Sequence, residues 1–228
     1  MPTRRQIVRL IGALAVAPTF ARAEERVEYA LVADDGAPVQ NFRIPVELDP
    51  AKLPGIIWRG DKSADVILYE FFDYNCAFCR KAQHDIEALL ANDPKTRLGL
   101  VNYAILSIGS VQAAKVQQAV LRLFGPKAAY DFHSKLFSKR GQIDGATALA
   151  VARELGLDPK KIEESGDSPS VSATLTQQAK LAESLDMGMT PSFAIAGVGL
   201  LGWPGPQSLR KIIANVRKCD RPLCEEKG

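Results

Sequence analysis

The sequence predicts an α/β fold in which a β-α-β unit and a β-β-α unit enclose a helical block. A continuous apolar run at 65–72 leads into an amphipathic stretch, and such runs are typical of strands buried on both faces. Apolar residues then recur with helical spacing from about 109 to 186, before two short apolar segments return between 192 and 201. With 46% hydrophobic and 24% charged residues among 228, the composition is that of an ordinary globular protein.

Residues 1–23 have the features of a cleaved export signal. A basic start with Arg4 and Arg5 precedes an apolar run from 10 to 17 and a small-x-small cleavage site that ends at Ala23. The segment 3–9 resembles a twin-arginine signal, and a general secretory signal is the alternative. Either signal exports the protein, so we expect a periplasmic location. The apolar run is too short to cross a bilayer, and we expect no membrane span in the mature chain.

The charge balance argues against partners that bind through positive charge. The whole chain has a formal charge of +3, but residues 1–23 hold four arginines and no acidic residue. Removing them leaves 25 basic and 26 acidic side chains, a charge of −1. A nearly neutral chain gives no electrostatic reason to bind nucleic acid or an anionic membrane. The even number of cysteines, four, suits an oxidising compartment.

Residues 24–59 form an N-terminal extension that is interrupted by prolines, with one strand expected near 41–46. A turn at 60–63 opens the main domain, which extends from 60 to 228.

The main domain begins with the strand at 65–72, which is apolar except for Glu70 near its end. A helix is expected from Cys76 to about Ala91, because its apolar residues fall on one stripe. A second buried strand is expected at 98–106.

The helical block at about 109–186 contains several helices, two of which are separated by Gly125 and Pro126. Strands are then expected at 192–196 and 198–201, and the chain ends in a helix with Leu209, Ile212, Ile213 and Val216 in phase.

The pair Cys76 and Cys79 predicts a redox active site. Two cysteines three positions apart on the first turn of a helix lie close enough to form a disulfide, and the first lies at the helix N-terminus. Unpaired backbone N–H groups and the helix dipole lower a thiol pKa there from about 8.5 to roughly 3.5–7.5. We therefore expect Cys76 to be the reactive, solvent-accessible thiolate and Cys79 to face the interior. We expect Asn75 to cap this helix, His84 to lie on its exposed side and His133 to pack on a helix face.

Cys219 and Cys224 admit three interpretations. Their short, turn-prone spacer favours a local structural disulfide. A second redox pair is one alternative, and a zinc site shared with Cys76 and Cys79 is another. Zinc ribbons usually place their cysteine pairs on tight turns close together, whereas these two pairs lie far apart in the chain. We expect no metal and no cofactor.

Two segments resemble the bacterial DsbA family. They are Glu70-Phe71-Phe72-Asp73-Tyr74-Asn75-Cys76-Ala77-Phe78-Cys79 and Met189-Thr190-Pro191-Ser192-Phe193. The resemblance covers roughly residues 60 to 216 and implies a thioredoxin-like fold with a helical insertion. It also implies thiol-disulfide oxidoreductase activity in which Cys76 attacks and Cys79 resolves.

The resemblance implies roles for five further positions. Pro191 is a cis-proline beside the sulfurs, and it leaves the Thr190 backbone free to pair with an extended substrate segment. Ala77 and Phe78 contribute to the same substrate-binding surface. Glu70 is a buried acid that shuttles the proton of Cys79, and a solvated Glu70 is the alternative.

The implied partners are exported proteins with cysteines and a membrane redox partner of the DsbB or DsbD kind. The best-known strong oxidants of the family have Pro-His between the cysteines and valine before the cis-proline, whereas this chain has Ala77-Phe78 and Thr190. Thr190 is similar to the isomerase and DsbG branches, so disulfide isomerase or reductase activity remains open. A non-catalytic exported binding or chaperone protein is the alternative from another class.

Overall fold

The computed structural model describes residues 28–45, 48–49 and 52–225. The predicted export signal lies outside these residues. The described part contains six strands and six helices. In chain order they are β1 (Gln40–Arg43), β2 (Ile57–Arg59), β3 (Val66–Phe72), α1 (Ala77–Asn92), β4 (Thr96–Asn102), α2 (Ile108–Phe137), α3 (Gly145–Glu154), α4 (Pro159–Gly166), α5 (Pro169–Ser184), β5 (Ser192–Ile195), β6 (Val198–Leu201) and α6 (Pro206–Cys219).

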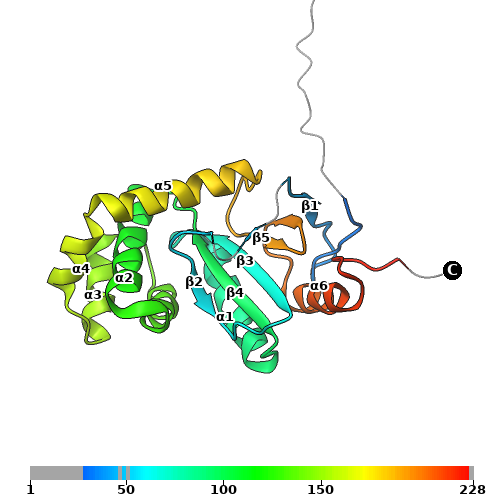
Figure 1. Cartoon of the computed structure of the whole chain (residues 1–228), viewed down its shortest axis with the longest axis horizontal. Helices are drawn as coiled ribbons and strands as arrows, with labels where there is room; N and C mark the ends of the chain where they lie inside the picture. Colours follow the sequence, from blue (N-terminus) through cyan, green and yellow to red (C-terminus); the bar gives the residue numbers. More distant parts are fainter. Residues whose placement is uncertain (1–27, 46–47, 50–51, 226–228) are drawn as a thin grey trace, which may run out of the picture.

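The strands form one mixed sheet in the order β1-β6-β5-β3-β4-β2 (Figure 1). β3 and β4 are parallel and are joined through α1, while the other neighbours are antiparallel. The helices α2 to α5 stand between β4 and β5 in the sequence. This order confirms the predicted α/β fold, with a helical block between a β-α-β unit and a β-β-α unit.

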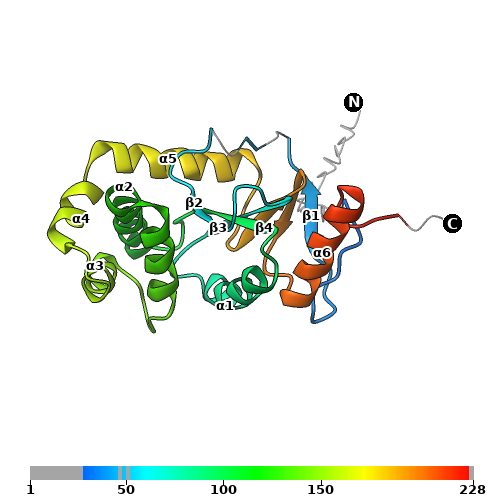
Figure 2. The same ribbon diagram turned by 60° about the horizontal axis from the view of Figure 1, so that its bottom comes forward.

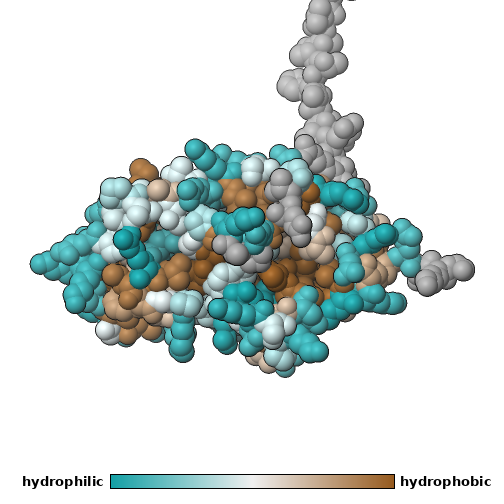
Figure 3. Space-filling model, in the orientation of Figure 1, coloured by the Kyte–Doolittle hydropathy of each residue, from teal (hydrophilic) through white to brown (hydrophobic). Residues whose placement is uncertain are grey.

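Helices cover the two faces of the sheet unequally. Figure 2 shows α1 and α6 on one face and α5 along the other, with α2, α3 and α4 together at one end. The larger apolar core lies between the sheet, α1, α6 and the helical block, and a smaller one lies beside the end of α5. Figure 3 shows apolar side chains over the middle of the α5 face, where Figure 1 draws β3, β4 and β5. In β3, β4 and β5 all residues except the partly buried Ile67 and Arg97 are buried, which agrees with central strands covered on both faces.

Both edge strands come from residues before 60. β1 pairs with β6 and begins one residue before the predicted strand near 41–46. β2, which pairs with β4, has no counterpart among the predicted strands. It is only three residues long, and of these only Ile57 is fully buried, so it has no recognisable alternation of apolar and polar residues.

The prediction of a strand at 98–106 was wrong at both ends. The observed β4 begins at Thr96 and ends at Asn102. After it, the Tyr103 N–H still donates to the carbonyl of Phe72, but the following residues form a loop in which Ile105 is 46% exposed. Apolar sequence alone did not distinguish this exposed loop from a continuing buried strand.

The helical block follows the expected pattern. Gly125 has φ of 82° and breaks α2 immediately before Pro126, which gives the predicted separation into two helices. Such a backbone conformation favours glycine, and proline is well tolerated at the start of the next helical segment. The N-terminal ends of α2 and α5 are capped by the side chains of Ser107 and Ser168.

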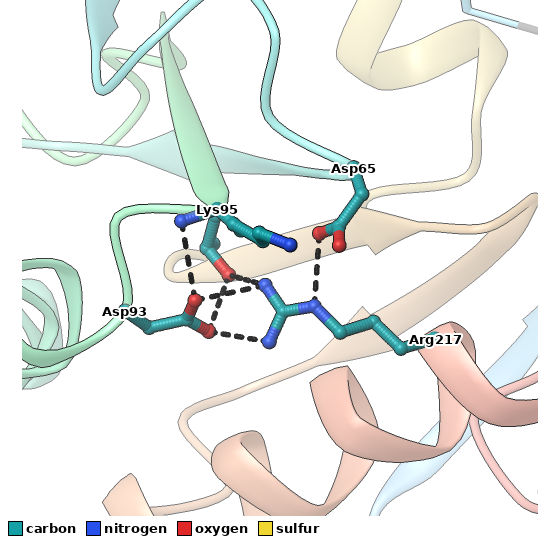
Figure 4. A network of polar contacts seen from close by, with 5 residues as sticks. Asp65, Asp93, Lys95 and Arg217 are labelled. Carbon is teal, nitrogen blue, oxygen red and sulfur yellow. Dashed lines mark hydrogen bonds and ion pairs between the residues drawn. The ribbon is translucent and has the colours of Figure 1, made fainter.

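An arginine near the end of α6 fastens that helix to the sheet. Arg217 forms a two-pronged contact with the carboxylate of Asp93, at 2.7 and 2.9 Å, and donates to Asp65 at 2.8 Å (Figure 4). The Arg217 guanidinium is the main cause of the lowered pKa of Asp93. The three side chains are partly exposed, so each ion pair contributes only about 0.2–1 kcal/mol. Their main effect is to fix α6 against the residues that precede β3 and β4.

Cys219, the last residue of α6, forms a disulfide with Cys224, with an S–S distance of 2.07 Å. Closing so short a loop stabilises the folded chain by about 2 kcal/mol in the chain-entropy estimate. Among the described residues, no helix is both long enough and apolar enough to cross a membrane.

Candidate active site

Cys76 is the N-cap residue of α1. The N–H of Cys79 donates to its sulfur at 3.2 Å, and the Cys76 thiol donates to the carbonyl oxygen of Thr190, also at 3.2 Å. The apolar strand β3 ends at Phe72, so the short turn that follows delivers the sulfur to the first turn of the helix.

The environment of Cys76 favours its thiolate. The pKa of Cys76 is lowered from 9.0 to about 6, mainly by a hydrogen bond from the Cys79 thiol. Further hydrogen bonds come from the Thr190 side chain and from the first backbone amides of α1, and together they outweigh the effect of burial. Cys76 is 5% exposed and Cys79 is fully buried. Cys76 is thus less accessible than the sequence suggested, because it lies against the Thr190 carbonyl, but it is the more accessible of the two.

Cys79 and Glu70 are buried beneath the reactive sulfur. Burial is the main cause of the strongly raised pKa of Cys79, and the charge of Glu70 adds to it. Glu70 lies on β3 between β4 and β5, fully buried, and neither carboxyl oxygen has a hydrogen-bond partner. Burial and the nearby Cys76 raise its pKa to about 8. The solvated Glu70 considered above does not agree with this position.

The peptide bond between Thr190 and Pro191 is cis. Pro191 is buried and Thr190 is partly exposed, directly before β5. The carbonyl of Thr190 faces the Cys76 sulfur, which brings the two sequence motifs together at one place although 114 positions separate them.

Exposed apolar side chains are found next to the two active-site motifs and in the stretch that is bonded to the Asp73 and Asn75 side chains. Phe78 is 65% exposed and Met189 is 45% exposed, and Ala77 is also exposed. Three further residues form what we call the apolar segment, namely Ile105, Leu106 and Ile108, which are 46%, 53% and 81% exposed. Apolar side chains left in water near a reactive group are typical of binding surfaces.

Asn75 was predicted to cap α1, but Cys76 takes that position. Its side-chain amide instead reaches into the helical block. It donates to Ser107, Ser110 and the Ile143 carbonyl, and it accepts the Ile143 N–H at 2.7 Å. Asn75 therefore ties the active-site turn to the start of α2 and to the loop before α3.

Asp73 is a further buried residue of this turn that the sequence interpretation missed. Its side chain is 1% exposed and accepts hydrogen bonds from two backbone amides of the loop after β4 and from the Ser110 hydroxyl of α2. An acid between two aromatic residues was its only sequence signal, and these three donors lie more than 30 positions away.

Neither of the two histidines belongs to the group of side chains around Cys76 and Cys79. The His84 side chain is 89% exposed, and His133 is fully buried, where its ring contacts Tyr74 at 3.3 Å and Gln83 at 2.9 Å. Burial lowers the pKa of His133 to about 3, so it is neutral at physiological pH. Its role is packing beneath the active-site turn.

The pairing of the cysteines bears on the zinc alternative. Cys76 and Cys79 are free thiols, while Cys219 and Cys224 are bonded to each other, which is incompatible with a single site of four thiolates. Within the described ranges, no group of three or more histidine, cysteine or acidic side chains is arranged to hold a metal ion.

Cys76 is expected to be the first thiol to react with iodoacetamide, with a rate that rises through a midpoint near pH 6, because its thiolate is stabilised in the folded protein. Mass spectrometry of samples quenched at each pH measures the rate at each sulfur. The variant Cys76→Ser should lose the fast reaction. A midpoint near the free thiol value of about 8.5, or a fast reaction that survives in Cys76→Ser, would contradict the assignment.

Comparison with known proteins identifies the family. Residues 67–214 match the DSBA-like thioredoxin domain family. The structure is similar to a thioredoxin-like oxidoreductase from Silicibacter pomeroyi, with a TM-score of 0.69 and 30% identity over 75% of this chain and 99% of that one. It is also similar to the thiol-disulfide exchange protein alpha-DsbA2 from Wolbachia pipientis, with a TM-score of 0.66 and 26% identity over 72% and 88% of the two chains.

The curated relatives are longer than the matched region. Disulfide bond formation protein D of Bacillus subtilis is 23% identical over 60% of this chain and 65% of its own length. The chain spans 28% of the other matched relative, the Na(+)/H(+) antiporter NhaA of Herminiimonas arsenicoxydans. The family match covers more than half of the chain and includes both cysteines and the cis-proline. The chain therefore belongs to the family of DsbA-like thioredoxin domains, a family of thiol-disulfide oxidoreductases.

Proposed function

We propose that this protein exchanges disulfides with exported proteins through Cys76 and Cys79. In the oxidising direction, a substrate thiolate attacks the sulfur of Cys76 in the Cys76–Cys79 disulfide and releases the Cys79 thiolate. A second substrate thiolate then displaces Cys76 from the mixed disulfide. The substrate loses two electrons and two protons, and the protein ends as the dithiol.

The observation that carries this proposal is the contrast between the two thiols. The pKa of Cys76 is lowered to about 6 at the helix N-terminus, whereas burial raises the pKa of Cys79. Cys79 is fully buried, so the mixed disulfide forms at the more accessible Cys76, and the stabilised Cys76 thiolate is then the good leaving group of the second exchange. Cys79 then has the role of the resolving sulfur, because it is protonated until a base takes its proton.

Glu70 is the group placed to exchange that proton. It is the acid whose charge acts on Cys79, and its pKa of about 8 lets it both accept and release a proton near neutral pH. The carboxyl has no competing hydrogen-bond partner. Glu70 therefore acts as the general base when Cys79 attacks and as the acid in the reverse step.

The substrate is a protein segment in an extended conformation. The Thr190 backbone, beside the cis-proline and next to Cys76, offers the donor and acceptor groups of a strand edge. Phe78 and Met189 add exposed apolar area near this edge. These contacts favour cysteines that have apolar neighbours in an unfolded or partly folded chain.

The N-terminal sequence supports export, with 1–23 as a cleaved signal, 24–59 as an extension and 60–228 as the catalytic domain. A periplasmic location requires a membrane partner that restores the redox state of the cysteine pair. A DsbB-like partner would reoxidise it and a DsbD-like partner would reduce it. Thr190 and Phe78 differ from the residues of the strong oxidants, so the reduction potential decides between the two directions.

The test is catalysis of oxidative refolding of a reduced, cysteine-containing protein and of insulin reduction. We expect the unaltered protein to accelerate at least one of them and Cys76→Ala to accelerate neither, because no mixed disulfide forms without that sulfur. Equilibration of the cysteine pair with glutathione then gives its potential, which we compare with the range of about −270 to −120 mV for members of the wider thioredoxin superfamily. Binding of unfolded chains without acceleration of either reaction would favour the binding or chaperone function.

A further inference from the structure

Asp73 links the active-site turn to the apolar segment. Its side-chain Oδ2 atom accepts the N–H groups of Ile105 and Leu106, each at 2.9 Å. Its Oδ1 atom accepts the N–H of Asn75 at 2.7 Å and the hydroxyl of Ser110 at 2.6 Å. The carboxylate is 1% exposed, and each of its oxygens accepts two hydrogen bonds.

The two amides that Asp73 binds belong to a stretch of unusual composition. β4 ends at Asn102, and α2 begins at Ile108. Between them, the chain exposes large apolar side chains instead of burying them. The hydrophobic effect would favour movement of these side chains out of water and into the protein. The paired hydrogen bonds to the buried Asp73 carboxylate oppose this movement, because they fix the backbone at two successive residues.

This anchored stretch lies beside the reactive sulfur. Asn75, the residue before Cys76, donates from its side chain to the Ser107 hydroxyl at 3.1 Å. The apolar segment is therefore held next to the turn that precedes Cys76, at the start of α2. Cys76 itself contacts the Thr190 carbonyl, so the active-site turn is bonded both to the Thr190 edge and to the residue beside the apolar segment.

We propose that Asp73 is a positioning residue that holds the apolar segment, Ile105, Leu106 and Ile108, where it contacts apolar side chains flanking the cysteine of a substrate protein. The inference rests on the proposed disulfide exchange and names a determinant of its substrate preference. Asp73 acts through the position of the apolar segment and does not take part in the reaction.

Substitution of the Asp73 side chain separates docking from sulfur chemistry. Its backbone carbonyl accepts the Cys76 N–H at 3.1 Å, and this bond is kept in any side-chain variant. Asparagine has the same shape but only one acceptor oxygen, so Asp73→Asn leaves some of the four donors without an acceptor. The apolar segment then loses part of its anchorage while Cys76 keeps its place.

The experiment compares two synthetic peptides, each with two cysteines, flanked by leucines in one and by serines in the other. Their oxidation by the full chain is followed with oxidised glutathione as the final acceptor of electrons. For Asp73→Asn we expect KM for the leucine peptide to rise roughly tenfold, equivalent to about 1.4 kcal/mol of binding free energy. The KM for the serine peptide should rise less, and the effect on kcat should stay within about twofold.

Two further variants test the route through the apolar segment. Leu106→Ser alters an exposed side chain and should raise KM for the leucine peptide in a protein of unchanged stability. The double variant should show less than the sum of the two effects, since both remove the same docking surface. Asn41→Ala is the matched control, because Asn41 is also fully buried and bonds to Tyr29 and Val39 at the β1 edge of the sheet. It should lower stability without changing the preference for leucine.

The outcomes separate the two proposals. Equal changes of KM for both peptides, additive effects of Asp73→Asn and Leu106→Ser, or the same loss of preference in Asn41→Ala would overturn the positioning role while leaving disulfide exchange in place. Failure of the unaltered protein to oxidise either peptide would overturn both.

Discussion

The variant Cys79→Ala is expected to accumulate covalent adducts with exported proteins that contain cysteine. In the normal cycle, Cys79 displaces the substrate from Cys76 by an intramolecular attack, for which effective molarities reach about 10⁵ M when the groups are well oriented. Without that sulfur, the adduct is resolved only by a thiol from solution or by another thiol of the substrate itself. We expect its lifetime to increase by at least about a thousandfold for this reason.

Expression of the variant in a bacterial periplasm makes the adducts visible. Non-reducing gels should show bands of high mass that disappear on treatment with dithiothreitol, and mass spectrometry should locate the linkage at Cys76. Cys76→Ala should form none, because it lacks the nucleophile. The double variant Cys219→Ala/Cys224→Ala is the matched control and should behave as the unaltered protein, since those residues form a separate disulfide. Equal adducts in Cys76→Ala and Cys79→Ala, or adducts in neither, would remove the oxidoreductase mechanism.

The parts of the site that follow from the sequence are those specified by neighbouring residues. An apolar strand that runs into Cys76-Ala77-Phe78-Cys79 predicts a thiol at a helix N-terminus, because periodicity and capping are local properties. The burial of Glu70 is what the resemblance to the DsbA family implied, and its position in an otherwise apolar strand agrees with it. Both expectations depend on fewer than about a dozen adjacent residues.

The parts that do not follow are those created by contacts between distant segments. Of the groups that bind the Asp73 carboxylate, only the Asn75 N–H is close in sequence, and the others belong to α2 and to a loop after β4. That loop was mistaken for the end of a strand because Ile105 and Leu106 are apolar. Their backbone amides pair with the carboxylate and not with a strand, and only the fold brings these groups together. The missed edge strand β2 has the same cause, because its pairing with β4 depends on tertiary contacts.

The second large effect concerns Glu70 and the dependence of stability on pH. Burial raises the pKa of Glu70 from 4.5 to about 8 in the folded protein. Between these values the carboxyl is protonated when folded and ionised when unfolded, so unfolding releases a proton. Stability contributed by this group therefore falls as the pH rises through that window. At pH 7 the ionised carboxyl of the unfolded chain favours unfolding by about 3 kcal/mol, from 1.36 kcal/mol for each pKa unit.

Glu70→Gln removes this ionisation while keeping the size and polarity of the side chain. The free energy of unfolding of the variant should be close to that of the unaltered protein near pH 4.5 and should exceed it by about 3 kcal/mol at pH 7. Urea denaturation from pH 4.5 to 8 measures the difference, with both proteins fully reduced so that all their disulfides are open alike. The unfolding free energy of the unaltered protein is subtracted from that of Glu70→Gln at each pH, so that the contribution of Cys76 cancels. Cys76, with a pKa lowered to about 6, contributes stability that rises between pH 6 and 9 and opposes the trend of Glu70. Glu164→Gln, at an exposed position of α4, is the control and should differ from the unaltered protein by less than about 0.5 kcal/mol at every pH. If the difference for Glu70→Gln does not grow with pH, the Glu70 carboxyl is ionised in the folded protein, and it cannot supply the proton that the proposed exchange at Cys79 requires.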